Sequence, residues 1–437
     1  MKRLWAAVLL IIPTIVSAQV IGPDNARPIT LDEAVTMAQR NAPAAVQARG
    51  IERTSRQQVN NAYASFIPSL TVSAGGTRQF SNAQTIIRDG QTVTLPTEPW
   101  SYSTGLSFGV ELFDGGRRFY DLGAARASVD AAEANYVTQR FNVALNVKQQ
   151  YYNVLAARES ESAALAQLEQ AEQQLRSATA RVTAGVATKS DSLRSLIQLG
   201  NAQLALETAR NNLRVANAAL TRLVGVDQLV TAQPADTLEV IEPLAIDSVA
   251  LAQLAVEGPV VDQAEANLSA ARAGRRAANT RYLPTISASY QRGGSGTGRF
   301  GIGDDPYNYS GALRLNMSFP LFNQFSREDA IVRADVSRDN AEAQLRDSRL
   351  AAQQNLTQYL GALQLAEQRI QIQQASVDAA EEDLRVQQQR YALGASTLLD
   401  LLTSQTTLNQ ARAALISARY DYRVAKAQLE TLVGREL

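Results

Sequence analysis

The chain has 437 residues and carries 42 Lys and Arg against 42 Asp and Glu, so its balanced charge gives no sign of a nucleic acid partner. It contains no cysteine and no histidine, which excludes thiol chemistry, histidine-centred acid–base catalysis and the usual zinc sites. No pair of carboxylates falls in a glycine-rich or pocket-forming context. We therefore expect no catalytic residues, no cofactor and no metal, and a protein that is not an enzyme.

The first 18 residues have the three-part form of a secretory signal peptide. Two basic residues precede an apolar stretch from residue 4 to 16, and the small residues Ser17 and Ala18 follow it. The apolar stretch is too short to cross about 30 Å of hydrocarbon as a helix. We therefore expect residues 1–18 to be removed on export.

Two short helices and a strand are predicted next, and the same order recurs later in the chain. Thr30 opens a capping box, a hydroxyl followed three residues later by a carboxylate, and a helical stretch then extends to about Ala64. Pro68 marks the change from helix to strand, because proline disfavours helical geometry in the residue before it. A counterpart begins near Asp247, where Pro284 repeats Pro68 at an offset of 216 positions.

Beyond each of these prolines, apolar and polar side chains alternate as they do in strands. The returning strands alternate over about ten residues with aromatic side chains near the ends, the weak signature of a membrane β-barrel strand. We expect one hairpin at about 68–113 and another at about 284–322. A hairpin with one face on a soluble core would alternate in the same way, but neither half offers a sheet or helix to cover that face. The polar connections at 81–99 and 292–306 are predicted to be solvent loops.

Two long helical hairpins are predicted after the strands, at residues 117–225 and 327–434. Residues 117–182 contain no proline and one glycine, so an unbroken helix there would be about 100 Å long. The equivalent run, at 327–393, carries apolar residues seven positions apart at Leu356, Leu363, Ile370, Val377 and Leu384. A strict seven-residue repeat imposes a left-handed supercoil, which predicts coiled-coil packing.

The turn of each helical hairpin carries the strongest internal repeat in the chain. Residues 181–225 align without a gap with residues 390–434, and about 20 of the 45 paired positions are identical. In each copy a glycine, Gly185 or Gly394, stands where a left-handed residue ends a helix. A capping box opens the next helix three residues later, formed by Thr188 with Asp191 and by Thr397 with Asp400.

The repeat divides the chain into two halves, residues 19–225 and 247–437, joined by a linker at 226–246. The linker contains two prolines and at most one short strand, at residues 238–241. Each half supplies two short helices, two strands and two long helices, which gives four strands per chain. Four strands cannot close a barrel with an aqueous interior, whereas three chains would supply twelve.

This layout resembles the outer membrane efflux protein family, the TolC-like trimeric channel-tunnels, over essentially the whole mature chain. The resemblance rests on the duplicated layout, on the hairpin tips and on short segments at residues 67–70, 283–286 and 112–117. It implies a mainly α fold with a transmembrane β portion. Long coiled-coil hairpins would form an α-barrel, four strands per chain would contribute to a 12-stranded trimeric β-barrel, and residues 226–246 would be the equatorial linker.

The resemblance also implies a function, that of a passive export duct in a tripartite efflux or type I secretion system. The protein would be a homotrimer in the outer membrane of a Gram-negative-type cell, with a large periplasmic part. Its implied partners are a periplasmic adaptor protein, an inner-membrane pump and outer membrane lipid, and not nucleic acid. The alternative is a secreted coiled-coil structural or adhesive surface protein, which explains the heptads but leaves the alternating strands without a purpose. Drug, metal and protein stay open as cargo.

The hairpin tips are implied to be the periplasmic entrance and the place where the adaptor docks. The family pattern falls on nine positions: Gly185, Val186, Thr188, Ser190, Asp191, Tyr391, Gly394, Thr397 and Asp400. In the family the aspartates ring the entrance, and Tyr391 would bond Asp191 across adjacent hairpins. Ser396 and Thr403 replace an arginine and a second aspartate of TolC, so we expect fewer charged contacts at the entrance. Helix capping alone explains both aspartates equally well.

Overall fold

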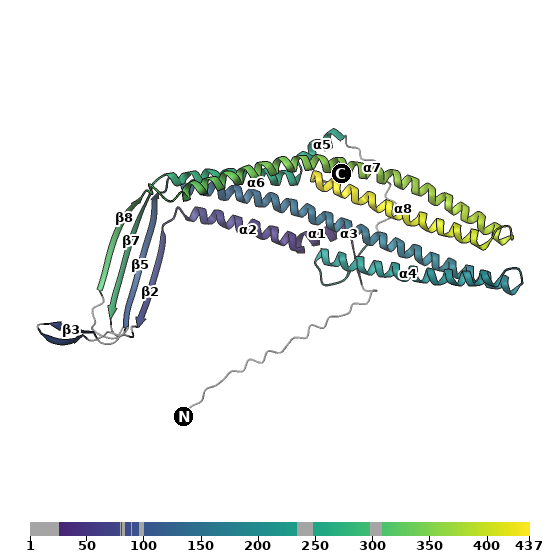
Figure 1. Ribbon diagram of the computed structural model, residues 1–437, viewed down its shortest axis with the longest axis horizontal. Coiled ribbons are helices and arrows are strands. Elements are labelled where there is room, and N and C mark those ends of the chain that lie inside the picture. Colours follow the sequence, from purple (N-terminus) through teal and green to yellow (C-terminus); the bar gives the residue numbers. More distant parts are fainter. Residues whose placement is uncertain are drawn as a thin grey trace, which may run out of the picture. The chain divides into compact units, whose positions relative to one another are not determined.

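A computed structural model gives the fold of the chain (Figure 1). It describes residues 26–78, 80, 84–88, 90–95, 100–233, 248–297 and 308–437. The predicted signal peptide at 1–18, most of the linker and the short strand predicted at 238–241 lie outside the described residues.

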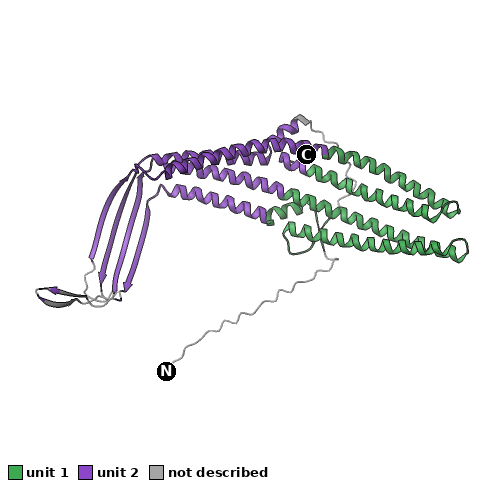
Figure 2. Ribbon diagram, viewed as in Figure 1, with its two compact units in different colours: residues 1–42, 143–242, 362–427 green, residues 43–142, 243–361, 428–437 purple. Residues whose placement is uncertain are grey.

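Two compact units make up the chain, and each draws on both halves of the sequence (Figure 2). Unit 1 comprises Met1–Ala42, Val143–Glu242 and Ala362–Ala427. Unit 2 comprises Pro43–Asn142, Pro243–Gly361 and Gln428–Leu437. The long helices pass through both units.

Unit 2 contains a four-stranded antiparallel sheet built from the two predicted hairpins. Its strands are β2 (Ser69–Arg78), β5 (Trp100–Phe113), β7 (Thr285–Thr297) and β8 (Asn308–Ser318), which lie side by side in that order (Figure 1). The pairing of β5 with β7 joins the hairpin of the first half to that of the second. The prediction of four strands arranged as two hairpins is therefore confirmed.

One face of this sheet carries an apolar row that crosses all four strands. The register places Leu70 opposite Phe108, Phe108 opposite Tyr290, and Tyr290 opposite Leu313. All four side chains are exposed, from 40% for the two aromatic residues to 77% for Leu313. A contiguous apolar surface of this kind in a single chain marks a place where lipid or another chain is in contact.

The two connections predicted to be loops are partly strands. Between β2 and β5, β3 (Gln84–Arg88) and β4 (Gln91–Leu95) form an antiparallel ribbon. Strand β7 also continues to Thr297, into the stretch predicted to be a loop from residue 292. The polar, glycine-rich sequence there hides the strand, which pairs through its backbone with β5 on one side and β8 on the other. At Gly293 a Cβ would lie 2.9 Å from the carbonyl oxygen of Thr104, so the pairing itself favours glycine.

The short helices fall where the proline pattern predicts them. Unit 1 contains α1 (Leu31–Asn41), and unit 2 contains α2 (Pro43–Ala64), α5 (Ser248–Val256) and α6 (Pro259–Asn279), which ends in the 3-10 turn η2 (Thr280–Tyr282). Thr30 caps α1 as predicted, because its hydroxyl oxygen accepts a hydrogen bond from the Glu33 N–H at 3.2 Å.

The four long helices form two hairpins, as predicted: α3 (Arg117–Thr183) with α4 (Lys189–Val224), and α7 (Ser326–Ala392) with α8 (Leu398–Val433). Helices α3 and α7 each run unbroken for 67 residues. The heptad row predicted on α7 is buried from Leu356 to Leu384, which confirms its packing role. None of the described helices combines the length and apolarity needed to cross a membrane.

Unit 1 holds a short parallel pair, β1 (Arg27–Ile29) with β6 (Val230–Ala232), that the sequence did not predict. Each strand has three residues, too few for an alternating pattern to show. Tyr151 of α3 is 3% exposed, and its hydroxyl lies 3.1 Å from the carbonyl oxygens of both Ile29 and Gln233. The start of the linker is thus fastened to a long helix.

Replacing Tyr151 by phenylalanine is expected to loosen the β1–β6 pair. Losing this buried hydroxyl costs about 1 kcal/mol, so the Gln233 amide, which donates to Ile29 at 2.9 Å, should exchange about fivefold faster. Hydrogen exchange read by mass spectrometry measures the change. Tyr359→Phe on α7 is the control and should leave that amide unchanged. Equal exchange in wild type and Tyr151→Phe would contradict the role of the hydroxyl.

Candidate functional site

Both helical hairpins turn through the same backbone motif in unit 1. Gly185 and Gly394 have φ values of +76° and +75°, in the left-handed region that favours glycine. The residue after each glycine donates its N–H to a carbonyl five positions earlier, Val186 to Arg181 at 3.0 Å and Ala395 to Arg390 at 2.8 Å. This combination is the Schellman motif, so the predicted helix ends at both glycines are confirmed.

The predicted capping boxes are present at both tips. At the first, the Thr188 N–H donates to Asp191 Oδ2 at 3.0 Å, and the Asp191 N–H donates back to the Thr188 hydroxyl at 3.3 Å. At the second, the same bonds join Thr397 and Asp400 at 2.9 and 3.2 Å. The threonine hydroxyl also donates to the aspartate in each box. Each carboxylate is thus engaged within its own tip.

Capping at the second tip should be insensitive to pH until strongly acid conditions. Hydrogen bonds from the N–H and then the hydroxyl of Thr397 hold the pKa of Asp400 below its ordinary value of 3.8. A carboxyl with a lowered folded pKa stabilises fully above its unfolded value, and the effect is lost as pH falls through the folded value. Exchange of tip amides, corrected for intrinsic rates, should therefore be constant from about pH 7 to about pH 5. A loss of protection within that range would contradict this, and Asp400→Asn should raise exchange throughout it.

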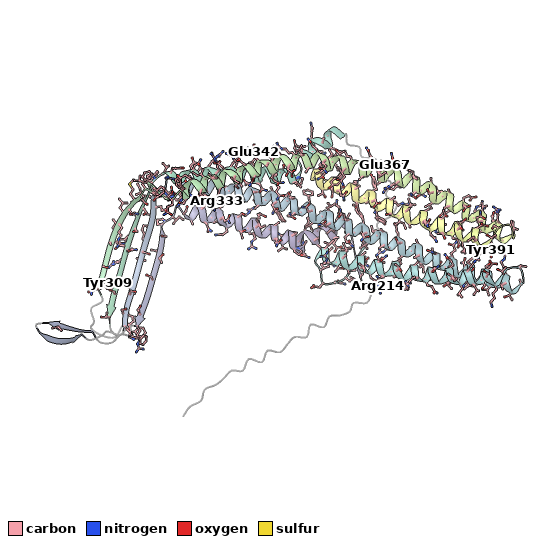
Figure 3. All side chains as sticks on the ribbon, viewed as in Figure 1. Arg214, Tyr309, Arg333, Glu342, Glu367 and Tyr391 are labelled. Atoms are coloured by element: carbon pink, nitrogen blue, oxygen red, sulfur yellow. The ribbon has the colours of Figure 1, made fainter. Side chains whose placement is uncertain are left out.

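The two tips are linked by Arg181 of α3 and Tyr391 of α7. Arg181 Nη1 donates to the Tyr391 carbonyl oxygen at 2.9 Å, and its guanidinium carbon lies 4.6 Å from the centre of the tyrosine ring. Figure 3 shows Tyr391 near the turn between α7 and α8. Burial raises the pKa of Tyr391; the positive charge of Arg181 opposes that rise, and the Asp191 carboxylate adds to it. We call this contact the Arg181–Tyr391 latch.

The expected bond between Tyr391 and Asp191 does not form within one chain. The buried hydroxyl of Tyr391 finds no hydrogen-bond partner among the described residues. A bond between neighbouring chains stays a prediction. Sequence reasoning missed Arg181, although the repeat offered a signal. Arginine stands at both 181 and 390 of the aligned copies, whereas the position of Tyr391 is occupied by Val182 in the first copy. The aromatic side chain is present in one copy only, and it is the one that Arg181 contacts.

Several other buried polar atoms near the tips lack a partner among the described residues. They are Gln174 Nε2, Arg181 Nε, Ser195 Oγ, Gln387 Oε1 and Ser396 Oγ. In the second hairpin the equivalent positions form a hydrogen bond, because the Ser404 hydroxyl donates to Asp383 Oδ2 at 2.5 Å. In the first hairpin these positions are occupied by Ser195 and Gln174. Buried polar groups without partners cost free energy, which weakens the packing at this end of the hairpins.

Known proteins match the chain along most of its length. A sequence model of the outer membrane efflux protein family matches residues 34–226 and 250–435. The pyoverdine export outer membrane protein OpmQ of Pseudomonas aeruginosa is 28% identical over 382 residues, which cover 85% of this chain and 76% of OpmQ. The outer membrane efflux protein BepC of Brucella suis is 25% identical over an alignment of 452 positions, gaps included, which covers 99% of this chain and 90% of BepC.

Solved structures show the same fold. The CmeC outer membrane channel of Campylobacter jejuni superposes with a TM-score of 0.75 at 21% identity, over 92% of this chain and 85% of CmeC. The resemblance drawn from the duplicated layout and the tips is thereby confirmed. The chain belongs to the outer membrane efflux protein family.

Proposed function

We propose that the two hairpin tips form the gate of a passive export duct and the surface on which a periplasmic adaptor docks. Membership of the family makes the chain an outer membrane efflux channel, with a helical tunnel in the periplasm, and favours this over a secreted surface protein. The gate residues are those predicted at the tips together with Arg181. An inner-membrane pump would supply the energy.

The Arg181–Tyr391 latch is the main observation in support of a gate at the tips. It joins two hairpins through one side chain, so releasing a single arginine frees α3 from α7 at their ends. Buried polar atoms without partners among the described residues belong to Arg181 itself and to Gln387 and Ser396, which are within five positions of Tyr391 in the sequence. Opening would expose these atoms to water, which offsets part of the free energy lost when the latch breaks. The closed arrangement is thus poised to open when a partner engages the tips.

A trimer would use the four-stranded sheet to cross the outer membrane. The apolar row from Leu70 to Leu313 is exposed in one chain, and lipid contact would cover it. Three sheets of four strands would close a 12-stranded barrel. We also propose that residues 19–225 and 247–437 are the two structural repeats, with 226–246 as the linker between them.

The native mass of the mature chain, extracted in detergent from outer membranes, tests the assembly, and single-channel recording in planar bilayers tests the duct. We expect a homotrimer that conducts weakly at rest. Addition of the adaptor encoded with the pump should raise its conductance. A monomer, or a protein released from membranes without detergent, would overturn the proposal.

A further inference from the structure

Unit 2 contains a groove between α3, α6 and α7 that is rich in arginine. The cavity has a volume of about 770 Å³. Four arginines line it, Arg272 and Arg276 from α6 and Arg346 and Arg349 from α7. Arg272 and Arg276 stand four positions apart, so they project from the same face of α6 about one turn apart. The groove therefore presents guanidinium groups from two helices to one space.

Acidic residues in the groove balance only part of this charge. Glu265 forms an ion pair with Arg349 at 2.6 Å. Glu342, which Figure 3 labels on α7, lies 3.8 Å from Arg346. The two α6 arginines, by contrast, have no hydrogen bond or ion pair with any residue in the described part of the chain. Two positive charges are thus left over in a concave site, where they attract anions.

Aromatic side chains form the α3 side of the same groove. Phe119 is 68% exposed and Tyr120 is 48% exposed. The Phe119 ring meets Phe66 edge to face, with 5.1 Å between the ring centres, and the rest of both rings is open to a ligand. Gly123 follows one turn later, and no atom lies within 4 Å of the place where its side chain would be. The wall beside the rings is therefore open enough for a flat molecule.

We propose that this groove binds an organic anion that carries an aromatic ring, as such a molecule passes through the duct; the proposal rests on the duct function. The free guanidinium groups of Arg272 and Arg276 would donate to carboxylate, sulfonate or phosphate oxygens, which they match in a forked geometry. The exposed rings would stack on the aromatic part of the ligand. The groove would thus retain anionic aromatic cargo over neutral or cationic cargo.

The test is the binding of pyranine, an aromatic trisulfonate, to the detergent-solubilised full-length protein, followed by fluorescence anisotropy. Replacing Arg272 and Arg276 together by alanine should weaken binding at least about tenfold. The matched control removes two exposed arginines of the same unit outside the groove, Arg53 and Arg333, and should change the affinity less than about twofold. Equal losses in both variants, or no loss in the groove variant, would overturn the proposal.

Two further measurements separate the parts of the proposal. Phe119→Ala should weaken binding of pyranine but not of inorganic sulfate, measured by competition, and an equal effect on both would overturn the aromatic part. Single-channel recording of the same preparations separates the groove from the duct. Channels that conduct without binding pyranine overturn this inference alone, whereas preparations that never conduct overturn the duct function on which it rests.

Discussion

Replacing Arg181 by alanine is expected to open the channel at rest and to raise its single-channel conductance several-fold. The substitution removes a charge-assisted hydrogen bond to the Tyr391 carbonyl and the contact with its ring. Together these contribute about 1–2 kcal/mol, which shifts the closed-to-open ratio of each chain about 5- to 30-fold. Planar bilayer recording of the purified protein measures the change.

Arg390→Ala is the matched control, because Arg390 occupies the position equivalent to Arg181 in the second half of the chain. Its guanidinium donates to the Ala395 carbonyl at 3.4 Å, and its charge acts on Asp400; both lie in its own tip, and among the described residues it forms no hydrogen bond to the other hairpin. The control channel should conduct like wild type. If both variants open equally, the channel opens because positive charge is lost at the tips, and not because the latch is broken.

Substitutions of Tyr391 separate the latch from a tyrosine–aspartate gate. Within one chain the latch uses the ring and the backbone carbonyl, and the hydroxyl is unpartnered. Tyr391→Phe keeps both and should leave conductance unchanged, whereas Tyr391→Leu loses the ring and should raise it. If Tyr391→Phe opens the channel as far as Arg181→Ala, the hydroxyl holds the gate through a neighbouring chain, and the bond to Asp191 expected from the family explains it.

Local signals in the sequence were sufficient to place the tips. Gly185 and Gly394 end helices because glycine adopts left-handed backbone without strain, and the two capping boxes need only residues three apart. The proline-marked change of period located the four strands in the same way. Each of these features depends on neighbours along the chain.

Features that depend on distant residues were not predictable. Arg181 and Tyr391 stand 210 positions apart, and nothing in either segment says that the two hairpins meet there. The β1–β6 pair has strands too short to show a pattern, and the continuation of β7 is held by its backbone rather than by its side chains. The groove arginines resemble any solvated helix face until α3 and α7 are placed around them.

Replacing Gly258 by alanine is expected to cause a large loss of stability in unit 2. Gly258 caps α6 with φ −79° and ψ 164°, a conformation that alanine adopts freely, so backbone strain is not the cause. An added Cβ would instead lie 2.1 Å from the Leu432 carbonyl oxygen near the end of α8. Because this neighbour is backbone, α8 or α6 must move, and we expect a cost of about 3 kcal/mol or more.

The half-life of the folded protein in detergent at elevated temperature measures this loss, since large membrane proteins unfold irreversibly. Gly274→Ala in the same helix is the control, because no atom lies within 4 Å of its added Cβ. It should stabilise the helix by about 0.5–1 kcal/mol, since alanine loses less entropy than glycine there. A Gly258→Ala protein with the same half-life as wild type would mean that the end of α8 moves at little cost in free energy. The contact between α6 and α8 would then be adjustable. Alanine at Gly434, whose Cβ would meet the Pro259 ring at 2.8 Å, should in that case cost only the backbone strain of its φ of +72°.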